Sequence, residues 1–182
     1  GNKIAALAGS MLSNEDLFML QRLFRKGFAS NNIDHRLQKN LPAAGERIDR
    51  KLGTPHVQST LKDFEDAKSV LVFGTSLADD LPILFLRVRK AWFKNGTKVV
   101  VAYDRNTDVD SFADIVLRYR PGSGHLLAEA FAGKKIDVEK ETGVKAADFK
   151  AAQEILKGAP IISTAGLYDG EHGADTARAL VE

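Results

Sequence analysis

Three short segments of this 182-residue chain combine glycine, hydroxyl and arginine side chains in a way that suits the binding of an anion. A glycine after a strand lets the backbone approach a ligand, and free N–H groups at the start of the next helix attract negative charge. An arginine nearby adds a permanent positive charge. We predict that these segments contact a phosphate-bearing ligand, although any one of them alone is explained more simply as an ordinary strand-to-helix turn. The candidate residues are Gly74, Thr75, Ser76, Arg105, Thr107, Gly122 and Ser123.

Catalysis and metal binding have less support from the residues present. The chain has no cysteine, so it cannot ligate an iron–sulfur cluster through thiolates. His56, His125 and His172 are far apart in the sequence and lack metal-ligand spacing, and we expect them at the surface or the edge of the core. Asp34 and His35 could form an acid–base pair, but adjacent side chains seldom face one another. A structural hydrogen-bonding role is the better interpretation of this pair, and we predict no catalytic residue and no metal ligand.

Composition excludes several other classes of protein. Hydrophobic residues make up 44% and charged residues 27% of the chain, as in ordinary globular proteins. The net charge is only +2 and the basic residues are dispersed, which gives no electrostatic footprint for nucleic acid. No apolar run approaches the roughly 18–20 residues of a membrane span. Neither a G-x-G-x-x-G fingerprint nor a G-x-x-x-x-G-K-[ST] loop is present, so we exclude the usual NAD-binding and P-loop sites.

The candidate residues are placed by alternating strands and helices. This alternation predicts an α/β fold with a mainly parallel sheet and helices on both faces, and such sheets bind ligands at the carboxyl ends of their strands. We expect one domain over residues 1–182, cut from a longer subunit, with residues 36–56 as an irregular connector rich in Gly and Pro. The predicted strands are 4–8, 69–73, 98–103, 114–118 and 161–162, and the predicted helices are 13–28, 80–95, 123–132, 146–157 and a C-terminal one.

A polar turn follows the first predicted helix. That helix has Leu17, Leu20, Leu23 and Phe24 at helical spacing, which indicates a face turned to the core. The turn reads Ala-Ser-Asn-Asn-Ile-Asp-His-Arg-Leu over residues 29–37. We expect Asn31, Asn32 and Asp34 to hold the helix exit against the sheet edge through bonds from side chain to backbone.

This turn resembles the T-N-N-x-D-H-R signature of the molybdopterin oxidoreductases. Five later segments match the family's motifs in the same order, among them residues 113–117, which resemble A-D-x-x-L. Residues 74–82 resemble G-S-N-P-x-E-x-x-P, residues 86–91 resemble L-R-I-R-K-A, residues 103–107 resemble D-P-R-x-T, and residues 120–124 resemble R-P-G-T-D. The resemblance implies a Rossmann-like domain of the formate dehydrogenase and DMSO reductase type. It also implies that the candidate loops descend from loops that hold part of the guanine dinucleotide of the molybdenum cofactor.

Three departures fall at the expected cofactor contacts. Ser76 replaces an asparagine, Tyr103 replaces an acidic residue suited to a ribose, with Asp104 one position away, and Gly124 replaces an aspartate suited to a guanine edge. In this the chain is similar to the G subunit of bacterial respiratory NADH:quinone oxidoreductase (complex I), whose domain is regarded as having kept the fold without molybdenum chemistry.

That similarity implies a structural and interaction domain with vestigial cofactor loops. The fragment would be inactive and without a cofactor, and iron–sulfur clusters elsewhere in the parent subunit would carry the electrons. Its partners would be the rest of that subunit and the other subunits of the respiratory complex. It would lie in the cytoplasm, peripheral to the inner membrane. The alternative is the guanine-dinucleotide-binding domain of an active molybdopterin oxidoreductase such as formate dehydrogenase. A third is a free-standing module for another phosphate-bearing ligand.

Overall fold

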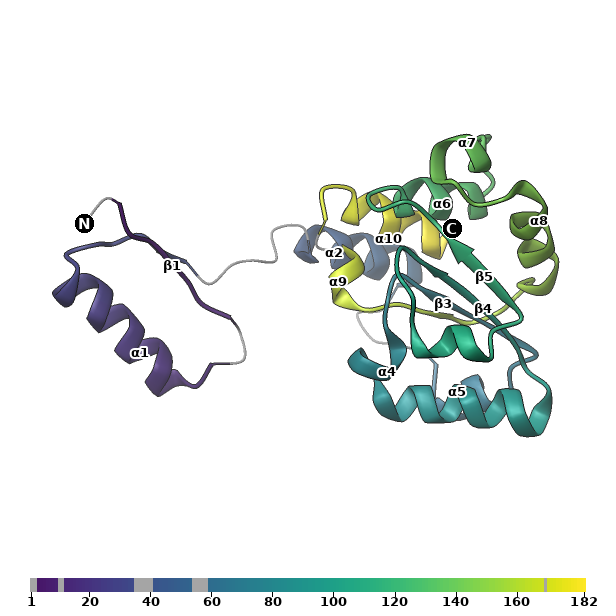
Figure 1. Ribbon diagram of the computed structural model, residues 1–182, viewed down its shortest axis with the longest axis horizontal. Coiled ribbons are helices and arrows are strands. Elements are labelled where there is room, and N and C mark those ends of the chain that lie inside the picture. Colours follow the sequence, from purple (N-terminus) through teal and green to yellow (C-terminus); the bar gives the residue numbers. More distant parts are fainter. Residues whose placement is uncertain (1–2, 10–11, 35–40, 54–58, 169) are drawn as a thin grey trace. The chain divides into compact units, whose positions relative to one another are not determined.

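The computed structural model describes residues 3–9, 12–34, 41–53, 59–168 and 170–182 (Figure 1). Contacts within the chain divide it into two compact units, residues 1–39 and residues 40–182. The larger parallel sheet falls within the second unit, and the first unit has a two-stranded pairing of its own.

The first unit contains two very short parallel strands and a helix. Its elements are β1 (Ala6–Leu7), α1 (Asn14–Arg22), the π-helix η1 (Leu23–Gly27) and β2 (Ile33–Asp34). Ser13 caps α1 by accepting a hydrogen bond from the backbone N–H of Asp16 at 3.1 Å, which confirms the predicted helix start. The predicted core face is only partly correct, because Phe24 is buried while Leu23 is 50% exposed. Two strands of two residues offer little surface for such a face to pack against.

The polar turn of the first unit is held by a serine. Ser30 is buried, and its hydroxyl donates to the carbonyl of Ile4 at 2.9 Å and accepts from the N–H of Asn32 at 3.3 Å. Among the described residues, the side chains of Asn31 and Asn32 have no hydrogen bond. Our prediction for the two asparagines was therefore wrong, because Ser30 is the residue that points inward. The motif beyond Asp34 lies outside the described residues.

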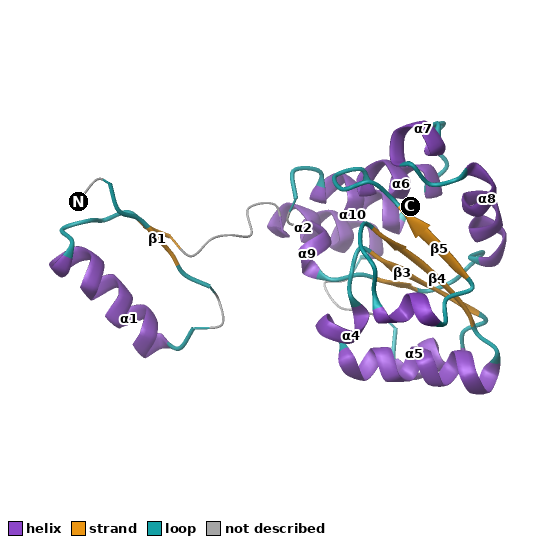
Figure 2. Cartoon of the chain, viewed as in Figure 1, coloured by secondary structure: helices purple, strands orange, loops and turns teal. Residues whose placement is uncertain are grey.

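The second unit is built on four parallel strands in the order β5-β4-β3-β6 (Figure 2). The register places Ser69 opposite Lys98 and Phe73 opposite Ala102. The strands are β3 (Ser69–Phe73), β4 (Lys98–Tyr103), β5 (Ile115–Arg118) and β6 (Ile161–Ile162). All four confirm predicted strands, and β5 begins one residue later than expected.

Helices cover both faces of this sheet, as predicted (Figure 1). They are α2 (Leu41–Leu52), α3 (Leu61–Asp66), α4 (Leu77–Asp80), α5 (Pro82–Asn95), the 3-10 helix η2 (Asp108–Ser111), α6 (Gly124–Phe131), α7 (Val138–Thr142), α8 (Ala146–Ile155), α9 (Ala165–Tyr168) and α10 (Gly173–Val181). Within the described residues, no helix has the length and apolar character needed to cross a membrane.

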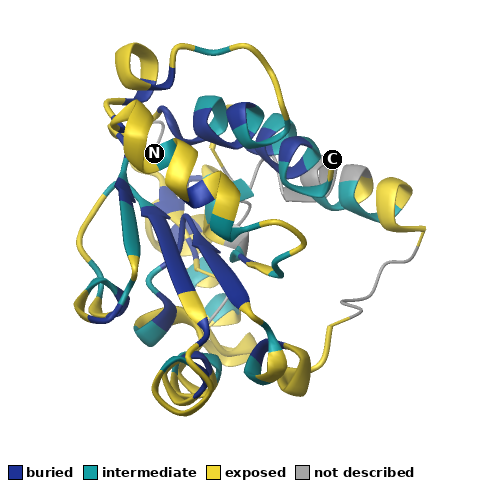
Figure 3. Cartoon of the chain, turned by 90° about the vertical axis from the view of Figure 1, so that its right-hand side faces the viewer, coloured by how far each residue is buried: buried dark blue, intermediate teal, exposed yellow. Residues whose placement is uncertain are grey.

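Alternation along the strands divides the core into two layers. Val70 and Val72 of β3 face α3, α4 and α5, whereas Leu71 and Phe73 face α6, α7, α8 and α10. Figure 3 shows the buried residues concentrated in the strands and on the helix faces turned toward them. Because both faces are covered, the strands can be apolar throughout, and this is why they were visible in the sequence.

The expected irregular connector at residues 36–56 contains a helix. Residues 41–52 form α2, which packs against α10, while 36–40 and 54–56 lie outside the described residues. Pro42 stands in the first turn, where a missing N–H costs nothing. Gly53 follows the last turn with a φ of 71°, and its N–H donates to the carbonyl of Asp49 at 2.8 Å. The residues that we interpreted as loop formers thus start and stop a helix.

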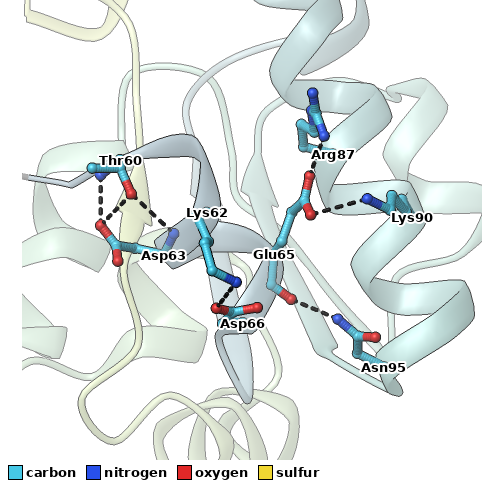
Figure 4. Close-up of polar contacts among 8 residues, drawn as sticks. All are labelled: Thr60, Lys62, Asp63, Glu65, Asp66, Arg87, Lys90 and Asn95. Carbon is cyan, nitrogen blue, oxygen red and sulfur yellow. Dashed lines mark hydrogen bonds and ion pairs between the residues drawn. The ribbon is translucent and has the colours of Figure 1, made fainter.

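A cluster of ion pairs ties α3 to α5 (Figure 4). The Glu65 carboxylate accepts from Arg87 at 2.5 Å and from Lys90 at 3.0 Å, and its backbone carbonyl accepts from the Asn95 side chain at 2.8 Å. Both cations lower the pKa of Glu65 through these bonds, Lys90 most. The cluster fixes the middle and the C-terminal end of α5 relative to α3, on the side of the sheet away from α10.

Candidate functional site

A cavity of about 930 Å³ opens at the carboxyl ends of the parallel strands. Gly74 follows β3, Asp104 follows β4, Tyr119 follows β5 and Thr164 comes shortly after β6, and all four line it. From β3 the chain builds β4 and β5 on one side and later returns to add β6 on the other. The cavity therefore lies at the topological switch point, where open α/β sheets bind their ligands.

Three of the seven predicted site residues, Gly74, Arg105 and Gly122, line this cavity. Gly74 has a φ of 65°, and its N–H donates to the carbonyl of Ala102 at 2.8 Å. A Cβ atom at this position would lie 2.4 Å from a methyl group of Leu167. Gly122 has a φ of 84° with open space around it. Both positions favour glycine because their backbone is left-handed, and at Gly74 the contact with Leu167 is a second reason.

Thr75 and Ser76 lie beside the cavity, but their hydroxyl groups are bonded within the protein. Thr75 is buried and donates to the carboxylate of Asp80 at 2.5 Å, and Thr164 donates to the same carboxylate oxygen at 3.4 Å. The Ser76 hydroxyl donates to Asp79. Asp80 thus joins the loop after β3 to the loop after β6, and the two hydroxyl groups shape the wall rather than face a ligand.

Thr107 and Ser123 also bond to their own loops. The Thr107 hydroxyl donates to Asp110 at 3.0 Å, and the guanidinium of Arg118 donates to the same carboxylate at 2.5 Å. The Ser123 hydroxyl donates to the carbonyl of Arg120 at 2.7 Å. Neither residue is among the described residues that line the cavity. Both hold the turns that carry the lining residues.

The exposed cation at the cavity is Arg105. Its Nε donates to the carboxylate of Asp104 at 3.0 Å, and its guanidinium lies 5.2 Å from the ring centre of Tyr103. The bond to Asp104 raises the pKa of Arg105, and the ring and the carboxylate add to this. The family pattern led us to expect an acidic group at position 103, which is Tyr103 here, and Asp104, one position later, also lines the cavity.

Two histidines that we expected at the surface or core edge lie together on the cavity wall. The rings of His125 and His172 stack with centres 3.9 Å apart and planes at 23°. Nδ1 of His125 lies 3.1 Å from the carbonyl of Gly122, and because a carbonyl only accepts, Nδ1 carries the hydrogen. Burial lowers the pKa of His125, and the neighbouring His172 lowers it further. His35 and His56 lie outside the described residues.

The described part of the chain contains no candidate metal centre. No group of three or more His, Cys, Asp or Glu side chains there is placed to hold a metal ion.

Tyr119 also lines the cavity, although the sequence did not mark it as a site residue. It is only 5% exposed, and its ring stacks on Phe73 with centres 5.9 Å apart. Its hydroxyl lies beside Gly124, where a Cβ atom would come within 3.1 Å of it, and has no hydrogen-bond partner among the described residues. Burial raises the pKa of Tyr119, and the negative charge of Asp104 acts in the same direction. The hydroxyl therefore remains a neutral donor.

Comparison with known proteins identifies the family. The model of the molybdopterin oxidoreductase family matches residues 1–182. The chain belongs to this family. The resemblance found in its motifs is confirmed at the level of the family, while the narrower resemblance to the G subunit of NADH:quinone oxidoreductase is not specifically supported.

Several curated relatives are similar over much of the chain. It is 28% identical to the NADPH-Fe(3+) oxidoreductase subunit alpha of Geobacter sulfurreducens, with 98% of the chain and 25% of the relative covered. It is 24% identical to the periplasmic nitrate reductase of Desulfovibrio desulfuricans, with 75% and 19% covered. It is 26% identical to the F420-dependent formate dehydrogenase subunit alpha of Methanocaldococcus jannaschii, with 86% and 24% covered. The chain thus spans a quarter or less of the length of these relatives.

A solved structure supports the predicted fold class. Acetylene hydratase from Pelobacter acetylenicus superimposes with a TM-score of 0.58 at 20% identity, covering 89% of this chain and 26% of that one. At this identity the likeness establishes the fold alone. It agrees with a parallel sheet flanked by helices, as expected for a domain of the molybdopterin enzymes.

Proposed function

We propose that this chain is the part of a molybdopterin oxidoreductase that holds the nucleotide end of the molybdopterin guanine dinucleotide cofactor. The observation that carries the proposal is the cavity at the switch point, where Gly74, Arg105 and Gly122 meet. Relatives named as nitrate reductase and formate dehydrogenase support this assignment over the complex I subunit that we first favoured. This proposal is the alternative of the sequence analysis, the guanine-dinucleotide-binding domain of an active molybdopterin oxidoreductase.

The residues present fit the phosphate and ribose groups of such a cofactor. At Gly74 the place of a Cβ atom is occupied by Leu167, so glycine lets this leucine of the cavity wall pack against the backbone after β3. The part of the chain that the structure describes offers no hydrogen-bond partner to the N–H groups of Gly124 and His125 at the start of α6. These N–H groups and Arg105 suit an anion, while the carboxylate of Asp104 suits a ribose hydroxyl. When bound, the cofactor would supply the redox chemistry, and this chain would bind and orient it.

Two departures argue for weak rather than tight binding of the guanine end. Gly124 offers no carboxylate at the base, and Asp104 is already bonded to Arg105. A lost hydrogen bond to a charged group costs about 1.5–3 kcal/mol, or roughly tenfold or more in affinity. Contacts outside this chain would have to supply the remainder, which is consistent with a chain that spans a quarter of its relatives' length.

A second candidate is the structural domain of the large peripheral-arm subunit of respiratory NADH:quinone oxidoreductase. The observation that favours it is that Thr75, Ser76, Thr107 and Ser123 bond to their own loops, as expected of vestigial cofactor loops. In this case, iron–sulfur clusters elsewhere in the parent would carry the electrons. A location in the cytoplasm, peripheral to the inner membrane, belongs to this candidate and stays a prediction.

Both candidates include partner subunits. Two relatives are named as alpha subunits, of an NADPH-Fe(3+) oxidoreductase and of a formate dehydrogenase. These names support a parent protein that works with other subunits, and we propose that this chain contacts them together with the rest of its own polypeptide.

Two measurements test the proposal. The first titrates the isotope-labelled 182-residue chain with GDP and follows amide chemical shifts, which we expect to change at residues 74–76 and 122–125. Absence of any change with millimolar GDP would overturn nucleotide binding. The second measures metal and pterin in the purified parent protein. Stoichiometric molybdenum supports the first candidate, and iron–sulfur clusters without molybdenum or pterin support the second.

A further inference from the structure

We propose that the Tyr119 hydroxyl donates a hydrogen bond to an anionic oxygen of the ligand, a phosphate group seated at the start of α6. The inference rests on the proposed nucleotide-binding function and assigns a contact in the cavity to a residue that no sequence motif marks.

The first argument is the state of the hydroxyl group. Each buried serine and threonine in the described chain donates its hydroxyl hydrogen to a carbonyl or carboxylate oxygen; Ser69 donates to Ile155 at 2.8 Å, and Thr97 donates to Ala67 at 2.8 Å. Tyr119 is buried to a similar degree, yet its hydroxyl has no such partner among the described residues. A buried polar group without a partner destabilises a fold, so its presence on a cavity wall indicates a partner outside the chain.

The second argument is the position of the hydroxyl. It lies beside Gly124, the first residue of α6, and both residues line the cavity. The N–H groups of Gly124 and His125 are likewise without partners in the described part of the chain, and the start of a helix carries partial positive charge. Three donors therefore belong to neighbouring residues of the cavity wall.

The third argument is charge. Arg105 lies at the end of the neighbouring strand and brings a guanidinium to the cavity. The carboxylate of Asp104 is bonded to this arginine at 3.0 Å, which offsets its repulsion of an anion. Nδ1 of His125 donates to a backbone carbonyl and does not compete for the ligand. The three donors and the guanidinium of Arg105 suit a phosphate oxygen, whereas the carboxylates of Asp80, Asp104 and Glu171, which also line the cavity, suit donor groups of the ligand.

The test compares Tyr119→Phe with Tyr168→Phe as a matched control. Each change removes one hydroxyl from a largely buried ring, but the Tyr168 hydroxyl is bonded to Ser163 and its residue does not line the cavity. Affinities for inorganic pyrophosphate and for GDP are measured by calorimetry, and Tm by thermal unfolding.

We expect Tyr119→Phe to weaken both ligands about tenfold or more, since the lost bond joins a charged group. Its Tm should stay the same or rise, because no bond within the protein is lost. Tyr168→Phe should leave both affinities unchanged and lower the Tm by about 2–4 °C.

The other outcomes each overturn a definite statement. Equal affinity of Tyr119→Phe and wild type for pyrophosphate would overturn the contact, whether or not GDP binding changes, and leave the nucleotide-binding proposal standing. A wild-type chain that binds neither ligand would overturn both. A large fall in Tm for Tyr119→Phe would show that the hydroxyl has a partner inside the protein and would also overturn the inference.

Discussion

Gly74→Ala is the substitution whose effect the structure defines most fully. Gly74 has left-handed backbone, with a φ of 65°, and a Cβ atom there would lie 2.4 Å from the Cδ1 atom of Leu167. Gly122 also has left-handed backbone, with a φ of 84°, but a Cβ atom there would meet nothing within 4 Å. Gly122→Ala therefore measures the backbone cost alone, and Gly74→Ala measures the backbone cost together with the displacement of a leucine.

The expected magnitudes follow from these two terms. Left-handed backbone costs a residue with a Cβ atom about 1–2 kcal/mol. Moving Leu167 away from its rotamer adds about 0.5–1.5 kcal/mol. We expect Gly122→Ala to lower the free energy of unfolding by about 1–2 kcal/mol and Gly74→Ala by about 1.5–3.5 kcal/mol.

Urea unfolding of the 182-residue chain measures both values. A double-mutant cycle with Leu167→Ala isolates the contact, because Gly74→Ala should then cost no more than Gly122→Ala. Leu167 also lines the cavity, so its displacement by the new methyl group should reduce GDP affinity in the single variant and not in the double variant. A cost for Gly74→Ala equal to that of Gly122→Ala in the wild-type background would refute the reasoning.

Three further predictions concern other parts of the chain. Ser30→Ala should lower the free energy of unfolding of the first unit by about 1–2 kcal/mol, because it leaves the Ile4 carbonyl unpaired. Asn32→Ala should lower it by less than about 0.5 kcal/mol. Urea unfolding compares the two variants, and the reverse order would contradict the hydrogen bonds described. The pKa of His125 is lowered by burial, so the unfolded chain binds this proton more tightly and stability should fall as the pH drops below about 6.5; Tm measured from pH 7.5 to 5.5 should decline less in His125→Asn than in wild type. The isolated chain should not reduce dyes with NADH or formate, and turnover above the buffer rate would contradict this.

The sheet could be predicted because burial on both faces leaves a simple trace in the sequence. The run from Ser69 to Phe73 is buried at every position, so no alternation with polar residues obscures it. Helix α2 was missed because Pro42 and Gly45 have low helix propensity, and packing against α10 outweighs it. At the first turn, asparagine is the commoner turn residue, but the inward direction of Ser30 decides which side chain makes the bond.

The cavity was predicted in position more than in detail. The glycines follow strand ends, and a local pattern reveals them. The stacking of His125 on His172 requires α6 and α10 to lie side by side, and no local pattern reports such a contact. Tyr119 follows an apolar strand and resembles a core residue in sequence. Only its hydroxyl, which has no partner among the described residues, distinguishes it from one.

The short strand β6 has a consequence for the order in which the molecule assembles. β3, β4 and β5 follow one another closely in the chain, whereas β6 contributes two residues and joins β3 only after α6, α7 and α8 have been made. The entropic cost of closing this long loop is repaid by few hydrogen bonds between β6 and β3. We therefore expect β6 to dock late in folding and to detach early in unfolding. Because Thr164, Leu167 and His172 lie beyond β6, the cavity can be complete only when this last edge is in place. Native-state hydrogen exchange should therefore show the amides of residues 161–167 opening at lower free energy than those of β3 and β4. A ligand in the cavity would then stabilise the docked β6 and slow its dissociation from β3.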